Sequence, residues 1–447
     1  MVELEKRGIP TVMWTSDYFV NDGEVSARSF GFDTIAMATM EKGTAAHPPE
    51  ELCRMVDASI DQVIAGLTKP VAKRKAEAPA PSKTITIQGN DLLDATEKMT
   101  RQFLEEGWSD GFPLVPPTLQ AVEQMLTGTQ LGRDKVICEL EPGNGIATVE
   151  KIAINAVMAG CRPEHMPVLI TAVRAIAEPI MCLRNQTMST SSQSPFFLLN
   201  GPIGKELNIN SKCCTLGPGS ASYANTVIGR AMTLITFNIG NAYPGVMYMG
   251  DQGSPLRYGM VAAENEEDSP WEALHVTKGY DKDTSTLSVQ WIYGISSFQD
   301  FNSYTAENLA KGLATVAATA TLANGMWITG RQGDPRHNAW AREQQLVFLC
   351  PQHAQVFARD GWGKDTLQQY LYDHARLPVE LMMLSKTPEA VKTSHPELAW
   401  ILDQPELEIP IVETPDCFNI AVVGATGGTS LYFEGARGMF TLPVRDE

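Results

Sequence analysis

The chain has 447 residues, 43% of them hydrophobic and 19% charged, with a formal net charge of −17 at pH 7. This composition is typical of a globular protein, and the length is enough for about two or three domains. The negative charge repels nucleic-acid phosphates and anionic membrane surfaces, so neither is expected as a partner. There is no apolar run of the ~18–20 residues that a membrane span needs and no signal-peptide core, which predicts a cytoplasmic protein.

Residues 1–68 predict a small α/β unit. Strands are indicated at 10–15 and 33–38 with a helix between them, and apolar residues at helical spacing predict a second helix over 49–67. This order favours a parallel pair of strands. Because two parallel strands cannot cover their own faces and edges, we expect the unit to pair with the second domain, another copy or a companion chain.

Residues 69–83 are rich in proline and basic residues and predict a solvated linker. The rest, 84–447, predicts a large α/β or α+β domain, or two subdomains, that binds the substrate. Its predicted helices are 148–159, 164–178 and 365–376, the last with Asp365 as N-cap, and its predicted strands are 195–200, 286–294, 326–329, 346–350 and 418–424.

The run ELEKRGIPTV at 3–12 and the turn AHPPEEL at 46–52 carry a resemblance to a known family. In this order they resemble the C-terminal half of the UGSC-like family of thioredoxin-linked selenoproteins and their cysteine versions, over residues 1–67. The resemblance implies a selenocysteine- or cysteine-Gly-Ser-Cys motif just before the first helix, and this sequence does not contain that motif. The motifs at 107–113, 263–266 and 269–272 resemble the domain that accompanies such units in some bacterial proteins.

Three explanations for the missing motif stay open. The reactive half is a separate polypeptide, or the start has been placed too late because a UGA selenocysteine codon was read as a stop, or the unit is a relic used only for assembly. The first two imply that selenium or sulfur chemistry reaches the long domain from outside the present sequence.

Three polar, glycine-rich or serine-rich segments predict binding of a small anion or polar substrate. They are 216–226, which opens a helix and is followed by an arginine, the uncharged run 185–194, and the strand exit 424–430. Plain turns or surface loops would also explain them. The predicted binding residues are Asn185, Ser189, Ser191, Ser192, Gly219, Ser220, Ser222, Asn225, Arg230, Gly427 and Gly428.

Two groups of carboxylates could supply acid–base catalysis. One is Glu141 on a glycine-rich loop with Lys151 on the following helix, for which a helix-terminal charge or a salt bridge is the favoured explanation. The other is Glu264 and Glu266 in an acidic run with His275 nearby, where clustered carboxylates raise one another's pKa or bind a cation. A solvated acidic face is the alternative.

The eight cysteines show no CxxC pair, so free thiols are expected. Cys213 and Cys214 precede the 216–226 turn, while Cys350 and His353 follow a predicted strand, where the two side chains could meet. Buried spectator cysteines are the alternative. The seven histidines show no metal-binding spacing, and the sequence indicates no cofactor.

These patterns together predict an enzyme for a small polar or anionic substrate. The leading expectation is a thiol- or selenol-linked oxidoreductase or reductive lyase that works with a companion chain or as a homo-oligomer. One alternative is a lyase, hydrolase or transferase that uses the glutamates and the lysine. The other is a non-catalytic assembly subunit of a two-chain complex.

Overall fold

The computed structural model describes residues 1–40, 47–68, 84–258, 260–320, 326–329, 343–384 and 387–445. The predicted linker lies outside these residues. The N-terminal unit is a two-stranded parallel sheet with its helices, as predicted, in the order α1 (Val2–Lys6), β1 (Met13–Ser16), α2 (Val20–Ser29), β2 (Met37–Met40) and α3 (Pro49–Thr68). The second strand begins four residues later than expected, because 33–36 form an irregular approach to it.

The N-terminal unit leaves much of its apolar surface uncovered. Trp14 on β1 is 41% exposed, and along α3 the side chains of Val56, Ile60, Ile64 and Leu67 are all exposed. The unit touches the long domain through α2 and the residue after it, which form what we call the seam. Its contacts are Asn21 Nδ2 to the Gly245 carbonyl (3.1 Å), Asn144 Nδ2 to the Ser29 carbonyl (3.3 Å) and the Arg184 guanidinium 4.5 Å from the Phe30 ring centroid.

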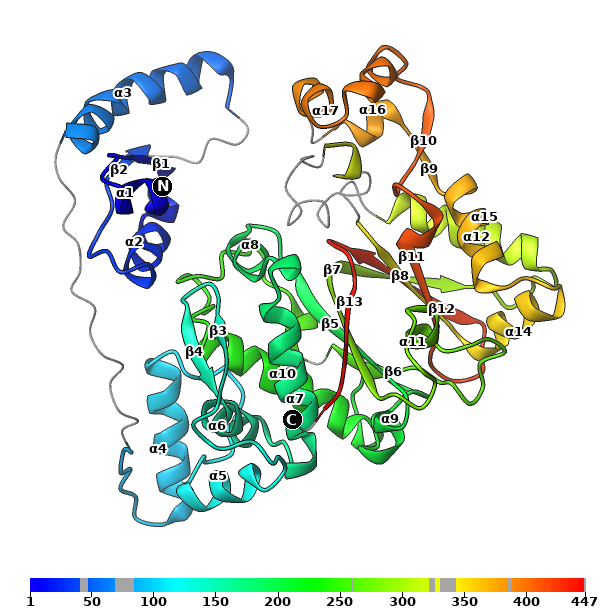
Figure 1. The fold of residues 1–447 in the computed structure, drawn as a ribbon, viewed down its shortest axis with the longest axis horizontal. Coiled ribbons are helices and arrows are strands. Elements are labelled where there is room, and N and C mark those ends of the chain that lie inside the picture. The colour runs from blue at the N-terminus through cyan, green and yellow to red at the C-terminus, as the bar shows by residue number, and fades with distance from the viewer. Residues whose placement is uncertain are drawn as a thin grey trace.

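A mixed sheet of seven strands organises the long domain (Figure 1). The strand order is β11–β8–β12–β7–β5–β6, with β13 also paired to β7, and the parallel pairs are β5 with β6 and β8 with β11. The strands are β5 (Ser194–Asn200), β6 (Val261–Ala263), β7 (Thr286–Gln299), β8 (Gln345–Leu349), β11 (Phe418–Val422), β12 (Thr429–Gly435) and β13 (Phe440–Pro443). Its edge strands β6 and β11 meet at their carboxyl ends, where the Asn265 N–H donates to the Val422 carbonyl at 2.8 Å, so the sheet curls into a half-barrel.

Alternating side chains of the strands fill two different cores. Phe196 and Leu198 of β5 face the inside of the half-barrel together with Phe348 of β8 and Phe433 of β12. The intervening residues face outward, where one group of helices packs on β5, β6 and β7 and another packs on β8, β11 and β12. This alternation, which has the period of two expected for strands, explains why the sheet is buried on both faces.

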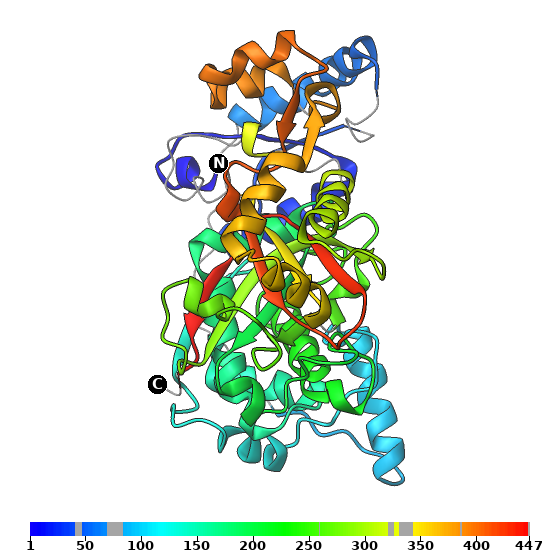
Figure 2. The same cartoon turned by 90° about the vertical axis from the view of Figure 1, so that its right-hand side faces the viewer.

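Helices cover the convex face of the half-barrel. The first group is α6 (Val149–Ala159), α7 (Met166–Ala177) and α10 (Tyr223–Asn238), and the second is α12 (Ala306–Thr319), α14 (Pro351–Arg359) and α15 (Lys364–His374). In the described part of the long domain, the remaining α-helices are α4 (Leu92–Glu105), α5 (Leu119–Leu126), α8 (Leu183–Met188), α9 (Ile203–Glu206), α11 (Leu274–Thr277), α16 (Val379–Met382) and α17 (Pro388–Ser394). Two short ribbons are β3 (Val136–Leu140) with β4 (Gly145–Thr148) and β9 (Arg376–Pro378) with β10 (Glu408–Pro410). The α4–α5 and α16–α17 pairs lie at opposite ends of the molecule (Figure 1, Figure 2).

The structure confirms the predicted α/β class and corrects several elements. The predicted strand at 326–329 is a 3₁₀ turn, because Ile328 is anchored in a small separate cluster and not in the sheet. The N-cap of α15 is Gly363 and not Asp365, which lies in the first turn. The polar run predicted at 185–194 begins inside a helix, because Leu183–Met188 form α8.

In the described part of the chain, no single helix has the length and apolar character of a membrane span. One pair, Pro163–Ala177 with Pro179–Met188, reaches them only when both members are counted, and it is bent by 68°.

Ionisation of Asp22 on α2 is expected to make the stability of the protein depend on pH. Burial raises its pKa from 3.8 to about 6, and the nearby Arg184 only partly opposes this effect. A carboxyl whose pKa is higher in the folded state than in the unfolded state contributes most to the stability of the fold when it is protonated, below its unfolded pKa. For Asp22 this contribution is lost as the pH rises through about 6. We therefore expect Asp22→Asn to stabilise the protein increasingly from pH 4 to about 6, with a constant gain above. Thermal unfolding of both proteins across pH 4–8 tests this, and parallel curves would contradict it.

Candidate functional site

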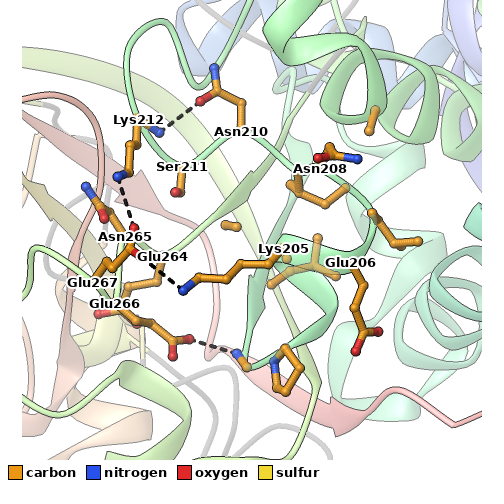
Figure 3. Close-up of a pocket in the computed structure, with 18 of the residues that line it drawn as sticks. Lys205, Glu206, Asn208, Asn210, Ser211, Lys212, Glu264, Asn265, Glu266 and Glu267 are labelled. Atoms are coloured by element: carbon orange, nitrogen blue, oxygen red, sulfur yellow. Dashed lines mark hydrogen bonds and ion pairs between the residues drawn. The ribbon is translucent and has the colours of Figure 1, made fainter.

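A cavity of about 1110 Å³ opens beyond the carboxyl ends of β5 and β6 (Figure 3). Because parallel strands end at the same edge of a sheet, the residues that follow them converge there, which is where α/β proteins commonly bind ligands. The segment after β6 contributes Glu264, Asn265, Glu266 and Glu267, and the run 201–212 after β5 forms a second wall. The 3₁₀ turn Ser220–Ser222 and the start of α10 form a third wall, which includes the predicted residue Ser220.

Glu264 lies at the base of this cavity and is held by four donors. Its side chain is fully buried, with Oε2 accepting from Asn200 Nδ2 (2.6 Å) and the Leu274 N–H (2.7 Å). Its Oε1 accepts from the Val422 N–H (3.2 Å) and faces Lys364 Nζ at 3.4 Å. Since both oxygens are engaged by the protein, this predicted catalytic carboxylate ties β5, α11, β11 and α15 together.

Glu266 is the carboxylate of this group that reaches the cavity while held in place. It is 32% exposed, and its Oε1 accepts from the Gly201 N–H (2.7 Å) and Asn200 Nδ2 (3.2 Å). The buried His275 places Nδ1 4.0 Å from the same oxygen, while its Nε2 lies 3.3 Å from the Lys282 carbonyl. A carbonyl can only accept, so Nε2 carries a hydrogen, while Nδ1 faces the carboxylate without a hydrogen-bond partner among the described residues.

Lysines and amides supply the polar recognition groups of the cavity. Lys205 and Lys212 reach Glu267 from the opposite wall, at 3.3 and 3.0 Å. The hydrogen bond to Glu267 raises the pKa of Lys212, and the two lysines lower the pKa of Glu267, so Lys212 and Glu267 stay charged near neutral pH. Further polar lining comes from Asn208, Asn210 and Lys282.

Of the residues predicted on the 216–226 turn, Ser220 lines the cavity, whereas Ser222 and Asn225 support the chain behind its wall. The Asn225 amide donates to the carbonyls of Asn210, Thr215 and Val261, and Ser222 Oγ donates to the Cys214 carbonyl at 2.6 Å. Gly219 is exposed beside them, with a positive φ of 129°. These bonds fix the run that carries Asn210 and Lys212.

Arg230 is not among the residues that line the cavity. Its Nε and Nη2 bind both oxygens of the fully buried Asp110, at 2.6 and 2.9 Å. The bidentate pair joins α10 to the 107–113 motif, so the guanidinium predicted as an anion fork already holds a carboxylate.

The other predicted polar residues also lie away from the cavity. Glu141 accepts from the Arg184 N–H (3.1 Å), and Lys151 Nζ donates to the Ile146 carbonyl (2.8 Å), so the structure does not bring the two together. The salt-bridge explanation of Glu141 fits this geometry. Nearby, Asn185 lies in α8, Ser189 and Ser191 share a hydrogen bond of 2.7 Å between their hydroxyls, and Ser192 follows them.

The eight cysteines are all free thiols. Cys213 and Cys214 are exposed with their sulfurs 3.8 Å apart, and the contact with Cys213 raises the pKa of Cys214, which is the opposite of thiolate activation. They follow Lys212 directly but do not line the cavity.

Cys350 and His353 do come together, as the sequence predicted, at the start of α14. Both are 2% exposed, with Cys350 as the N-cap residue. His353 binds Ser430 Oγ (2.7 Å) and the Asp300 carbonyl (2.9 Å), and the Cys350 thiol donates to the Gly427 carbonyl. Burial alone would raise the pKa of Cys350 and lower that of His353, but their mutual interaction outweighs it, so Cys350 is lowered and His353 raised.

Gly427 and Gly428 form the turn from β11 to β12 that closes over this pair. A side chain at Gly428 would collide with Asp300 and Phe301, so the turn needs glycine for a close approach of the two loops. Among the described residues there is no cluster of three metal-ligating side chains.

Residues 1–69 match the model of the UGSC family, so the N-terminal unit is a UGSC family domain, two residues longer than the resemblance indicated. The match does not extend into the long domain. Searches of the curated proteins and of the solved structures gave no match to the chain.

Several residues that line or support the cavity were missed by sequence reasoning. Asn200 ends the buried strand β5, and Lys205, Asn208, Asn210 and Lys212 belong to the polar run that follows it. The polar run that follows the apolar strand β5 could have indicated a binding wall. The segment it faces, after β6, lies about sixty residues further along the chain, and only the fold brings the two together.

The burial of Glu264 predicts an unequal response to two matched substitutions. Glu264→Gln leaves Lys364 buried without its countercharge, so we expect a loss of about 3–5 kcal/mol in the free energy of unfolding. Glu267→Gln removes only exposed ion pairs that solvent screens, and it should leave the free energy of unfolding nearly unchanged. Urea unfolding of both variants measures the difference, and equal losses would show that Glu264 does not hold the sheet edges.

Proposed function

We propose that this chain is an enzyme that binds a small, polar, anionic substrate in the 1110 Å³ cavity and acts on it by proton transfer at Glu266. The observation that supports this is the Glu266–His275 pair, in which a half-buried carboxylate at the carboxyl ends of two parallel strands faces a buried imidazole at 4.0 Å. Two hydrogen-bond donors hold the Glu266 carboxylate and the Lys282 carbonyl holds the imidazole, which supports Glu266 as a positioned general base.

The lining indicates the class of substrate. Lys205, Lys212 and Lys282 supply positive charge for a carboxylate or phosphate, and Asn208 and Asn210 supply amide donors and acceptors for hydroxyl or carbonyl groups. Reactions that begin with proton abstraction next to such groups are those of a lyase, a hydrolase or a transferase.

A thiol- or selenol-linked oxidoreductase or reductive lyase is the second candidate. Two observations favour it: residues 1–69 are a UGSC family domain, and Cys350 at a helix N-terminus has its pKa lowered by His353. In this proposal a companion chain supplies the family's reactive half, and that chain or another copy covers the exposed face of α3. The chain would act in the cytoplasm, where such thiols stay reduced.

The acid–base proposal is tested on the full chain. A ligand is first found by the rise in melting temperature across small carboxylic acids and phosphate esters. Exchange of that ligand's acidic C–H hydrogen with D₂O is then followed by NMR. We expect Glu266→Gln to slow exchange about 10²–10⁴-fold while binding persists, because only the proton acceptor is lost.

Glu267→Gln is the matched control and should retain exchange within about tenfold, since its carboxylate binds lysines and not His275. Wild-type exchange in Glu266→Gln would exclude the acid–base role. If no ligand raises the melting temperature, the non-catalytic assembly subunit becomes the better explanation.

The second candidate predicts a pH effect at Cys350. Because His353 lowers the pKa of this thiol, His353→Gln should move the pH midpoint of its alkylation upward. Alkylation rates with iodoacetamide, measured at Cys350 by mass spectrometry from pH 6 to 10, give the midpoint. Cys213→Ser with Cys214→Ser serves as a control that should leave it unchanged. A midpoint that is equal with and without His353 would remove the support for activated thiol chemistry.

A further inference from the structure

A second cavity, of about 530 Å³, lies at the seam between the UGSC domain and the long domain. Tyr18 reaches it from the UGSC domain, and the other lining residues come from α10 and from 244–258 of the long domain. It shares no lining residue with the first cavity. The Asn21 to Gly245 hydrogen bond crosses the seam beside it, so both units contribute to this cavity.

Arg257 is the unusual member of this cavity. It is 7% exposed, and its guanidinium lies 3.8 Å from the centroid of the Tyr248 ring. Its Nη2 donates to the Gln193 carbonyl at 3.3 Å, whereas Nε has no hydrogen-bond partner among the described residues. No carboxylate in the described chain forms an ion pair with it, although Asp251 lies exposed in the lining.

A buried arginine in such surroundings is costly without a countercharge. The protein nevertheless fixes this residue firmly, since the Arg257 carbonyl accepts a hydrogen bond from Thr233 Oγ1 at 2.6 Å. One face of the guanidinium stacks on Tyr248, and Arg257 lines the cavity, so an acid bound there would supply the missing countercharge. The other walls are largely aromatic and apolar, with Phe237, Tyr258, Pro244, Pro255 and Tyr18.

We propose that this cavity binds a small organic acid, with its carboxylate paired to the Arg257 guanidinium and a flat apolar body against the aromatic walls. The proposal is independent of the acid–base function of the first cavity. Because Tyr18 belongs to the UGSC domain, the bound acid would touch both units and stabilise their docking.

Benzoate is the probe, and benzamide is its uncharged counterpart. Titration calorimetry on the full chain should detect saturable binding of benzoate and none of benzamide, because only the acid carries the countercharge. Arg257→Gln should weaken benzoate binding at least tenfold, and Lys311→Gln, which removes one exposed positive charge on α12, should leave it unchanged.

Two further measurements keep the proposal testable if Arg257→Gln does not fold. Arg257→Lys keeps the charge but loses the planar fork, and Tyr18→Ala changes only an exposed wall residue, so both should fold and bind benzoate more weakly. Wild-type affinity in the Arg257 variants would place the binding elsewhere and overturn the proposal. Inorganic phosphate binding as tightly as benzoate would also overturn it, since the aromatic walls would then contribute nothing.

Discussion

The long domain depends on one buried carboxylate. Glu264 accepts hydrogen bonds from the end of β5, the start of α11 and the last residue of β11, and it neutralises Lys364 at the start of α15. A half-barrel has two free edges, and a charge buried without partners would be costly. Placing one acceptor where the edges converge satisfies several backbone donors together, and Asn265 continues the closure by bonding to β11. The closure therefore rests on the same short motif that enters the first cavity.

This closure also explains why the first cavity lies where it does. Glu264 turns inward as the structural member of the motif, so the chain direction carries Glu266 outward toward the cavity. The Asn200 Nδ2 donates to both carboxylates, so one amide group fixes the positions of Glu264 and Glu266. A substitution at Glu264 would thus move Glu266 as well, and the structural and chemical roles of the motif must be separated by variants of each carboxylate.

The sequence predicted strands best where both faces of the strand are buried. β5, β7, β8 and β11 were predicted because strands covered on both faces read as apolar runs, whereas the three-residue β6 and the glycine-flanked β12 carry too little pattern. Among the candidate site residues, Cys350 could be paired with His353 from sequence because they lie three residues apart, and Glu266 with His275 because they lie nine apart. Arg230 was misread because Asp110, which holds it, lies 120 residues earlier. Long-range pairing of this kind leaves no trace in a single sequence.

The UGSC domain has two surfaces at which other molecules could bind, the face of α3 and the seam. Its sheet has two strands, and most of α3 presents apolar side chains to solvent, so its own residues do not complete a layered fold. The contacts to the long domain involve α2 and its neighbours, not α3, which leaves that apolar face available to a partner while the seam is formed. A partner on α3 and a ligand at Arg257 would thus act on opposite sides of the same small unit. Since the unit has little core of its own, anything that binds at either side would change how firmly it is held against the long domain.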